Sequence, residues 1–194
     1  MSDERKIVLA STSPRRKELL ALTGLHFSVD QSDYEETLAT NVEPRQLARR
    51  LSLEKAKAVA EKYSDALIIA ADTFIVCRHS LLGKPHTSVE AARMLTLLSG
   101  RRHSVITGFT IIDTATGKRV SRSVLTKVWF RKLTKKETMS YVRTGEPLDK
   151  AGAYAIQGLG SMLVERIDGD YFNVIGLPLS SLAEALKKFV VYVL

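Results

Sequence analysis

One stretch limits the folds open to this chain more than any other, the apolar run ALIIAA at residues 66–71. An uninterrupted apolar run without alternation is typical of a strand buried on both faces, as in a sheet with helices on either side. Asp72 and Thr73 follow the run, and residues 74–76 are apolar again. The run therefore predicts a central strand of an α/β sheet.

Strand and helix patterns alternate along the rest of the chain. Two long strands around the turn at 114–117 predict an antiparallel hairpin. This alternation with a central hairpin favours an α/β fold with a mixed sheet. The predicted helices cover residues 14–22, 44–62, 88–98, 134–144 and 178–190, and the predicted extended segments cover 7–9, 66–76, 103–113, 121–130, 162–167 and 173–176.

Asp72 is the first candidate for chemistry, because it interrupts a buried apolar strand. A carboxylate is costly at such a place unless it is paired, hydrogen-bonded or bound to a metal. One interpretation is structural, with Asp72 paired to an arginine that fixes the strand register. The other is functional, with Asp72 serving as a base or metal ligand at the edge of a cleft.

The segment LASTSPRR at residues 9–16 predicts a strand, a tight turn and a helix. Ser13 is a suitable N-cap, Pro14 suits the first helical turn, and Gly24 closes the helix. A helix N-terminus with hydroxyl groups and two arginines can hold an anion such as phosphate. The alternative is a capped surface helix with solvated arginines.

Composition narrows the class of partner and the compartment. The net charge is +8 and the pI is near 9.6, which indicates an anionic partner without saying which one. A single cysteine excludes an internal disulfide and fits a reducing compartment. The charged N-terminus does not resemble a signal peptide, and no apolar run is long enough for a membrane span. We therefore expect a cytoplasmic protein.

Other polar side chains are candidates for binding a polyphosphate. The acidic stretch 33–37 could hold a divalent cation, or could be a solvated loop. Lys55 lies in an alanine-lined part of the predicted helix, from which a long cation could reach a ligand or simply extend to the surface. Lys84 lies between glycine and proline, where little backbone freedom suits phosphate binding, although many such turns are only turns.

The segment 148–158 (LDKAGAYAIQG) is rich in small residues, which would let a ligand approach the backbone. Lys150 could reach a phosphate. Gln157 carries both a donor and an acceptor, as reading the edge of a base requires. The chain contains neither a Walker A loop nor a dinucleotide fingerprint. The serines at 11 and 13 have no nearby partners of the kind used in acyl transfer.

Taken together, seven segments resemble the Maf family of nucleoside triphosphate pyrophosphatases, also called septum-formation inhibitor proteins. They occur in family order and cover nearly the whole chain, so the set is much more specific than any one of them. One departure is Ala71, where many members have glycine before the aspartate. The matching segments are residues 9–20, 50–56, 71–73, 83–85, 97–100, 146–154 and 174–178.

The resemblance implies an α/β fold with a long, bent mixed sheet flanked by helices, two lobes around a deep cleft, and one domain over 1–194. It also implies hydrolysis between the α- and β-phosphates that depends on a divalent cation, Mg²⁺ or Mn²⁺, and yields a monophosphate and pyrophosphate. In the family pattern Asp72 is the general base and Glu36 an acidic metal position. The positions expected to bind substrate are Ser11, Ser13, Arg16, Lys55, Lys84 and Lys150.

Three positions correspond to those that distinguish the branches of the family, namely Arg15, Thr73 and Gln157. This combination resembles the branch that acts on dTTP, UTP and modified pyrimidine nucleotides. The alternatives are a 7-methyl-GTP pyrophosphatase and a non-catalytic nucleotide-binding or nucleic-acid-binding regulator of septum formation. The resemblance implies a small-molecule nucleotide substrate and a homodimer, and we expect neither membrane association nor a stable nucleic-acid complex.

Overall fold

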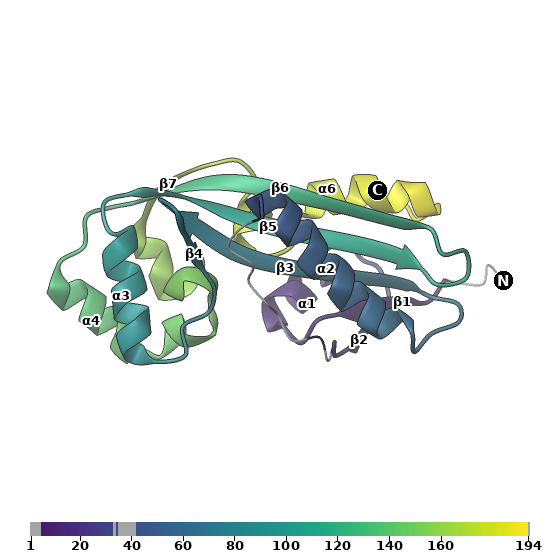
Figure 1. Ribbon diagram of the computed structural model, residues 1–194, viewed down its shortest axis with the longest axis horizontal. Coiled ribbons are helices and arrows are strands. Elements are labelled where there is room, and N and C mark those ends of the chain that lie inside the picture. The colour runs from purple at the N-terminus through teal and green to yellow at the C-terminus, as the bar shows by residue number, and fades with distance from the viewer. Residues whose placement is uncertain (1–4, 33, 35–41, 194) are drawn as a thin grey trace. The chain divides into compact units, whose positions relative to one another are not determined.

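The computed structural model describes residues 5–32, 34 and 42–193 (Figure 1). The chain divides into two compact units. The first consists of Met1–Asp72, Thr107–Val124 and Gly176–Leu194, and the second of Thr73–Ile106 and Leu125–Ile175. The predicted cleft and the single domain over 1–194 stay predictions. Across the described ranges, every helix is too short or too polar to cross a bilayer.

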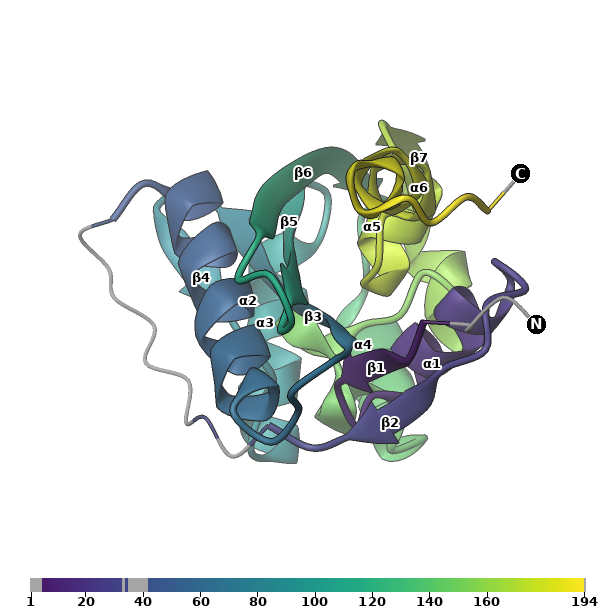
Figure 2. The ribbon, with the colours of Figure 1, turned by 90° about the vertical axis from the view of Figure 1, so that its right-hand side faces the viewer.

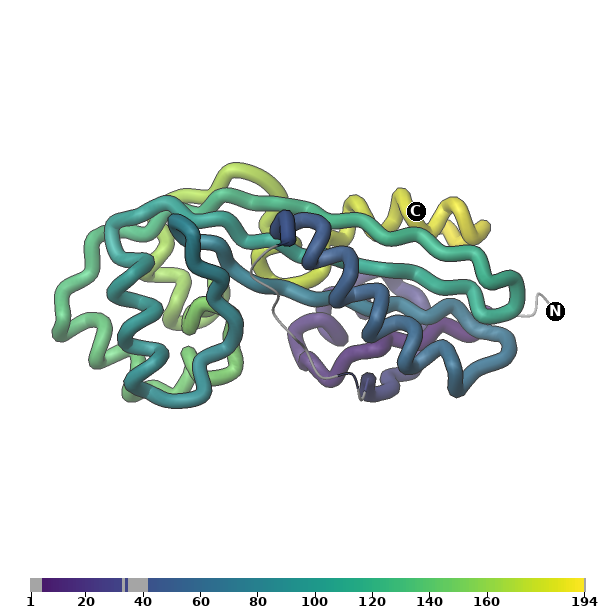
Figure 3. Tube along the Cα trace, viewed as in Figure 1, coloured from purple at the N-terminus to yellow at the C-terminus, as the bar shows by residue number. Residues whose placement is uncertain are grey.

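The strands form one mixed sheet, as predicted. Its order is β2-β1-β3-β5-β6-β7, and β4 pairs with β3. β1 is parallel to both β2 and β3, whereas β4 and β7 are antiparallel to their neighbours. A short turn joins the long strands β5 and β6 (Figure 3). The strands are β1 (Ile7–Ala10), β2 (Ser28–Asp30), β3 (Leu67–Cys77), β4 (Ser80–Leu82), β5 (Arg102–Asp113), β6 (Arg119–Phe130) and β7 (Val164–Asp168).

In the first unit, helices cover both faces of the strands. Figure 2 shows α2 (Pro44–Ala60) on one face and α6 (Leu179–Leu186) on the other. Consecutive residues of β6 reach opposite helices, as the alternation of a strand requires. Arg122 donates to the carbonyl of Ser181 on α6 at 3.4 Å, and Ser123 accepts from Arg49 on α2 at 3.1 Å. The run 66–71 is therefore buried on both faces, and every residue in it has an exposed fraction of 0%.

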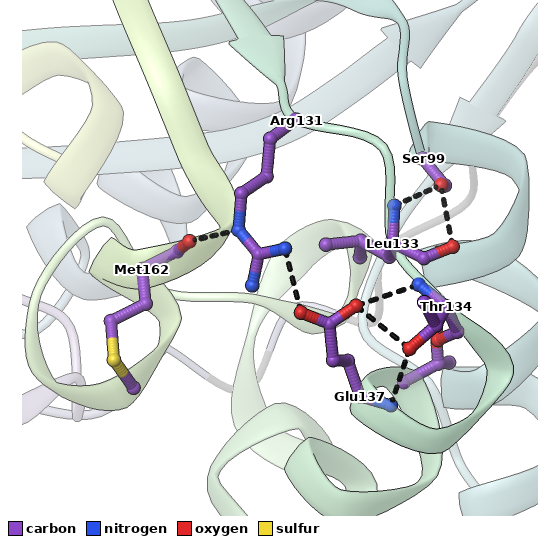
Figure 4. Close-up of polar contacts among 7 residues, drawn as sticks. Ser99, Arg131, Leu133, Thr134, Glu137 and Met162 are labelled. Atoms are coloured by element: carbon purple, nitrogen blue, oxygen red, sulfur yellow. Dashed lines mark hydrogen bonds and ion pairs between the residues drawn. The ribbon is translucent and has the colours of Figure 1, made fainter.

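In the second unit, α3 (Ser88–Leu98) and α4 (Lys135–Arg143) pack on a core of strand side chains. α4 begins at a capping box formed by Thr134 and Glu137, where the sequence predicts a helix over 134–144. Figure 4 shows the Glu137 carboxylate accepting from the backbone N–H of Thr134 at 2.7 Å and from Arg131 at 2.7 Å. This unit also contains the short helix α5 (Tyr171–Ile175) and the 3₁₀ turns Glu146–Asp149, Ala151–Ala153 and Gly158–Leu163.

The prediction of an extended segment at 173–176 is wrong, because residues 171–175 form α5. Asp170 explains the helix, since its carboxylate accepts from the backbone N–H of Asn173 at 3.0 Å and so caps the first turn. The Asn173 side chain is fully buried and donates to the carbonyl of Val105 and to the hydroxyl of Thr126. The apolar periodicity of the sequence gives no sign of these hydrogen bonds of Asn173.

Acid is expected to destabilise the second unit through His103. Its ring is 2% exposed, shares a 2.7 Å hydrogen bond with the Tyr154 hydroxyl, and packs edge-on against Phe130. Burial lowers the pKa of His103 from 6.5 to about 4. The unfolded chain therefore binds the proton more readily, so this contribution is complete above pH 6.5 and is lost as the pH falls towards 4. The full difference is roughly 3 kcal/mol.

Urea unfolding at pH 7.5 and pH 4.5 checks this expectation. His103→Phe should have a smaller loss of unfolding free energy between the two pH values than the unsubstituted chain. The exposed His26 offers a control, because His26→Asn should leave the loss unchanged. An equal loss in the chain and in His103→Phe would show that His103 does not cause the acid sensitivity.

Candidate active site

The candidate site in the first unit lies where the parallel pairing of β1 with β3 ends. β1 and β3 are in register with Ile7 beside Leu67 and Leu9 beside Ile69. Continued by two residues, the same register brings Ser11 beside Ala71, the residue before Asp72. Ligands of open α/β sheets bind at the carboxyl ends of parallel strands. The turn after β1 and the carboxylate of β3 therefore belong to one candidate site.

Helix α1 (Pro14–Ala21) begins in this turn, as predicted. Ser13 occupies the N-cap position, but its side chain makes no capping hydrogen bond. Pro14 has no backbone N–H, and the first bond of the helix is donated by Lys17 to the carbonyl of Ser13 at 3.1 Å. The N–H groups of the first turn thus belong to a helix end of partial positive charge, which suits an anion.

Arg16 is held in place at this helix end. Its Nε donates to the carbonyl of Gly176 at 2.9 Å, and its Nη1 donates to the Ser11 hydroxyl at 3.4 Å. The Ser11 hydroxyl also accepts from the backbone N–H of Ser13 at 3.3 Å. Ser11, Ser13 and Arg16 therefore form one connected group, and Arg15 lies half-buried on the same first turn.

Asp72 is 3% exposed, and its carboxylate pairs with the ammonium of Lys55. Strand alternation puts Asp72 on the same face of β3 as Ile68 and Ala70, which pack in the core with Ala56 of α2. The structural interpretation expected an arginine paired with this carboxylate, and the structure shows a lysine of α2 paired with it. The pair meets the requirement that a buried carboxylate be paired.

The position of α2 decides this pairing. Ala48, Ser52 and Lys55 follow one another on the sheet-facing stripe of the helix, at helical spacing. Gly108 of β5 lets α2 approach, because a Cβ there would lie 2.0 Å from the carbonyl oxygen of Ala48. Ser52 shares a 2.9 Å hydrogen bond with Thr110, two residues further along β5. Gly108 and Ser52 therefore set the register that brings Lys55 to Asp72.

Sequence reasoning missed both Gly108 and the hydroxyl contacts. Gly108 could have been found, because a glycine inside a buried strand often marks a close backbone approach. The hydroxyl contacts could not have been found from the sequence. The Thr110 hydroxyl shares hydrogen bonds with Ser52 on α2 at 2.9 Å and with Ser121 on β6 at 2.8 Å. These residues are distant in the sequence, and no local pattern joins them.

In the second unit, two predicted binding segments lie together. The backbone N–H of Gly152 donates to the carbonyl of Gly83 at 2.8 Å, which joins the Lys84 turn to the Lys150 segment. Lys84 is exposed. The Lys150 ammonium donates to the carbonyl of Glu146 at 3.0 Å and to the carboxylate of Asp149 at 2.5 Å.

The two remaining specificity positions belong to this unit and differ in their surroundings. Thr73 is half-buried on β3, directly after Asp72. Gln157 is exposed, outside any helix or strand, and precedes the turn Gly158–Leu163. A cavity of about 730 Å³ in the same unit, between α3 and the start of α4, is lined by none of the predicted site residues.

The predicted metal position, Glu36, lies outside the described residues. Within the described ranges, no group of three or more His, Cys, Asp or Glu side chains could hold a metal. Mg²⁺ does not require such a cage, because it is often bound by one or two carboxylates together with substrate phosphates. The predicted metal position, a single carboxylate acting with substrate phosphates, would fit that mode.

Comparison with known proteins decides the family. The family model of Maf-like proteins matches residues 6–189. The chain belongs to the Maf family. Curated Maf relatives are about half identical to it over nearly their whole length. The dTTP/UTP pyrophosphatase of Methanosarcina barkeri is 51% identical over 185 residues, which cover 95% of this chain and 94% of the relative. That of Moorella thermoacetica is 50% identical over 184 residues, with 95% of each chain covered.

A solved structure supports the same fold for this Maf protein. A HAM1 protein from Coxiella burnetii superposes with a TM-score of 0.54 at 15% identity, covering 95% of this chain and 99% of that one. At this identity the likeness concerns the fold alone. It agrees with the predicted mixed α/β architecture.

Proposed function

We propose that this Maf protein is a nucleoside triphosphate pyrophosphatase that hydrolyses dTTP and UTP, including modified pyrimidine nucleotides, to a monophosphate and pyrophosphate. The names of its relatives support the substrate class. The observation that carries the proposal is the buried Lys55–Asp72 pair, one residue along β3 from Ala71, which the register of β1 and β3 brings beside Ser11. Together with a divalent cation, this hydrolysis needs a base and an anion-binding site, and Asp72 and the N-terminal end of α1 are the candidates for these two.

In this proposal Asp72 orients the attacking water and accepts its proton, as a carboxylate general base does. Its carboxylate lies within β3 and is 3% exposed. Lys55 holds that carboxylate and contributes positive charge toward the phosphates. The phosphates are bound by Ser11, Ser13 and Arg16 together with the first turn of α1. Lys84 and Lys150 are the corresponding phosphate-binding candidates of the second unit.

A divalent cation is part of the proposal. Glu36 is the residue proposed to hold it, together with the nucleotide phosphates. When bound, a cation neutralises polyphosphate charge and stabilises the pyrophosphate leaving group. We also propose that the protein is cytoplasmic, acts as a homodimer on a small-molecule substrate, and forms no stable complex with nucleic acid or membrane.

The test is pyrophosphate release from canonical and modified nucleoside triphosphates, with Mg²⁺, with Mn²⁺ and with a chelator. We expect cation-dependent release that is fastest with dTTP and UTP. Faster release from 7-methyl-GTP would retain the enzyme class and contradict the assignment of Arg15, Thr73 and Gln157. Absence of release from every nucleotide would contradict the enzymatic proposal itself.

A second prediction concerns base recognition. Gln157→Glu removes the amide donor and adds a negative charge where the proposal has a side chain reading the pyrimidine edge. We expect the ratio of kcat/KM for UTP to that for GTP to fall about tenfold or more, since an unpaired polar group is costly in a recognition site. Steady-state kinetics on both substrates measure the ratio. An unchanged ratio would contradict the role of Gln157.

A further inference from the structure

Glu146 makes more contacts in the second unit than its place in a surface turn requires. Its carboxylate accepts from the Tyr141 hydroxyl at 2.8 Å and from the backbone N–H groups of Leu159 at 3.2 Å and Gly160 at 3.0 Å. Tyr141 is 6% exposed, so this carboxylate is tied to the core on one side and to the turn Gly158–Leu163 on the other.

These contacts hold the backbone before and after Gln157. The Tyr141 hydroxyl accepts from the backbone N–H of Ala155 at 3.3 Å, two residues before Gln157. Glu146 accepts from Leu159, two residues after it. Residues 154–157 lie outside regular secondary structure, so these bonds hold a segment that no helix or strand holds. The position of Gln157 therefore depends on Glu146 and Tyr141.

The fit of the segment is tight. A Cβ at Gly160 would lie 2.5 Å from the Tyr141 hydroxyl and 2.3 Å from the carbonyl oxygen of Ala155. Burial, followed by the hydrogen bond to Glu146, raises the pKa of Tyr141, so the phenol stays protonated and keeps donating at neutral pH. The carbonyl of Glu146 also accepts from the ammonium of Lys150 at 3.0 Å.

We propose that Glu146 is a positioning residue for base recognition, which acts together with Tyr141 by holding the backbone on both sides of Gln157. This inference rests on the proposed role of Gln157 and deepens it. The backbone carbonyl of Glu146 also accepts a hydrogen bond from Lys150. Glu146 therefore helps to position both Gln157, the proposed base-reading residue, and Lys150, a phosphate-binding candidate. A residue with this role affects discrimination between bases as well as overall rate.

The test compares kcat/KM for UTP and for GTP in Glu146→Gln, Tyr141→Phe and Gln157→Ala, and in each of the first two combined with Gln157→Ala. We expect each single substitution to lower the UTP-to-GTP ratio roughly fivefold or more. In the Gln157→Ala background the first two substitutions should change the ratio by less than about twofold, because residues that act through one another are not additive.

Glu137→Gln is the matched control. Glu137 also accepts from a backbone N–H and from two side chains in the second unit, but these donors belong to Thr134 and Arg131 at the start of α4. Its substitution should lower stability without moving the ratio. Thermal unfolding of every variant is measured together with the kinetics. If Glu146→Gln does not fold, the test rests on Tyr141→Phe, which keeps the buried ring.

The outcomes separate the inference from the proposed function. If Gln157→Ala leaves the ratio unchanged, the base-reading role fails and the inference fails with it. If Gln157→Ala lowers the ratio while Glu146→Gln and Tyr141→Phe do not, the inference alone is overturned. An equal loss for UTP and GTP in Glu146→Gln and Tyr141→Phe also overturns it, because that result means a structural role only.

Discussion

Asp72→Asn is expected to lower kcat about 10²- to 10⁴-fold while nucleotide binding changes little, since the amide cannot accept the proton of the attacking water. The substitution keeps the shape of a side chain that is 3% exposed and pairs with Lys55. Pyrophosphate release measures turnover, and calorimetric titration with a non-hydrolysable UTP analogue measures binding. Loss of binding together with turnover would instead make Asp72 chiefly a metal or structural residue.

The chain offers a matched control in Asp113→Asn. Asp113 is also 3% exposed in the first unit, where it pairs with Arg5 and accepts from the Thr116 hydroxyl at 2.6 Å. The next residue, Thr114, donates its backbone N–H to the carbonyl of Ala66. That places Asp113 near the start of β3, about 20 Å along the strand from Asp72. Asp113→Asn should reduce stability and leave turnover intact.

Gly108→Ala is expected to destabilise the first unit by about 3 kcal/mol or more, because the added methyl meets the backbone of α2 rather than a flexible side chain. The new Cβ would lie 2.0 Å from the carbonyl oxygen of Ala48. Relief of that clash requires α2 to move away from β5, which also displaces Lys55 from Asp72. Urea unfolding measures the stability, and we expect pyrophosphate release by the folded fraction to fall as well.

Gly117→Ala is the comparison for this variant. Gly117 lies in the turn between β5 and β6, where a Cβ would have no heavy atom within 4 Å, and its φ of +70° makes alanine mildly strained. That strain costs about 1 kcal/mol. Gly117→Ala should therefore lower stability less than Gly108→Ala and leave turnover unchanged. Equal effects of the two substitutions would contradict the close approach of α2 as the cause.

Many elements could be predicted from the sequence because their signals are local. The helix predicted over 88–98 is observed over the same residues, and the helix predicted over 134–144 is observed as α4 with its caps at Thr134 and Thr144. The buried run 66–71 required a sheet covered on both faces, and the structure has one. Where the signal was a distant polar contact, the prediction failed, as with Asn173 in α5, whose side chain is bound by Val105 and Thr126.

For the candidate site, the sequence by itself determined which residue types are present and that a carboxylate in a buried strand needs a partner. Tertiary structure decided that this partner is Lys55, because Gly108 and Ser52 set where α2 lies on the sheet. It also decided that Glu146 reaches the backbone beyond Gln157. Helix caps depend on residues that are neighbours in the chain, whereas these pairings arise from packing between segments far apart in the sequence.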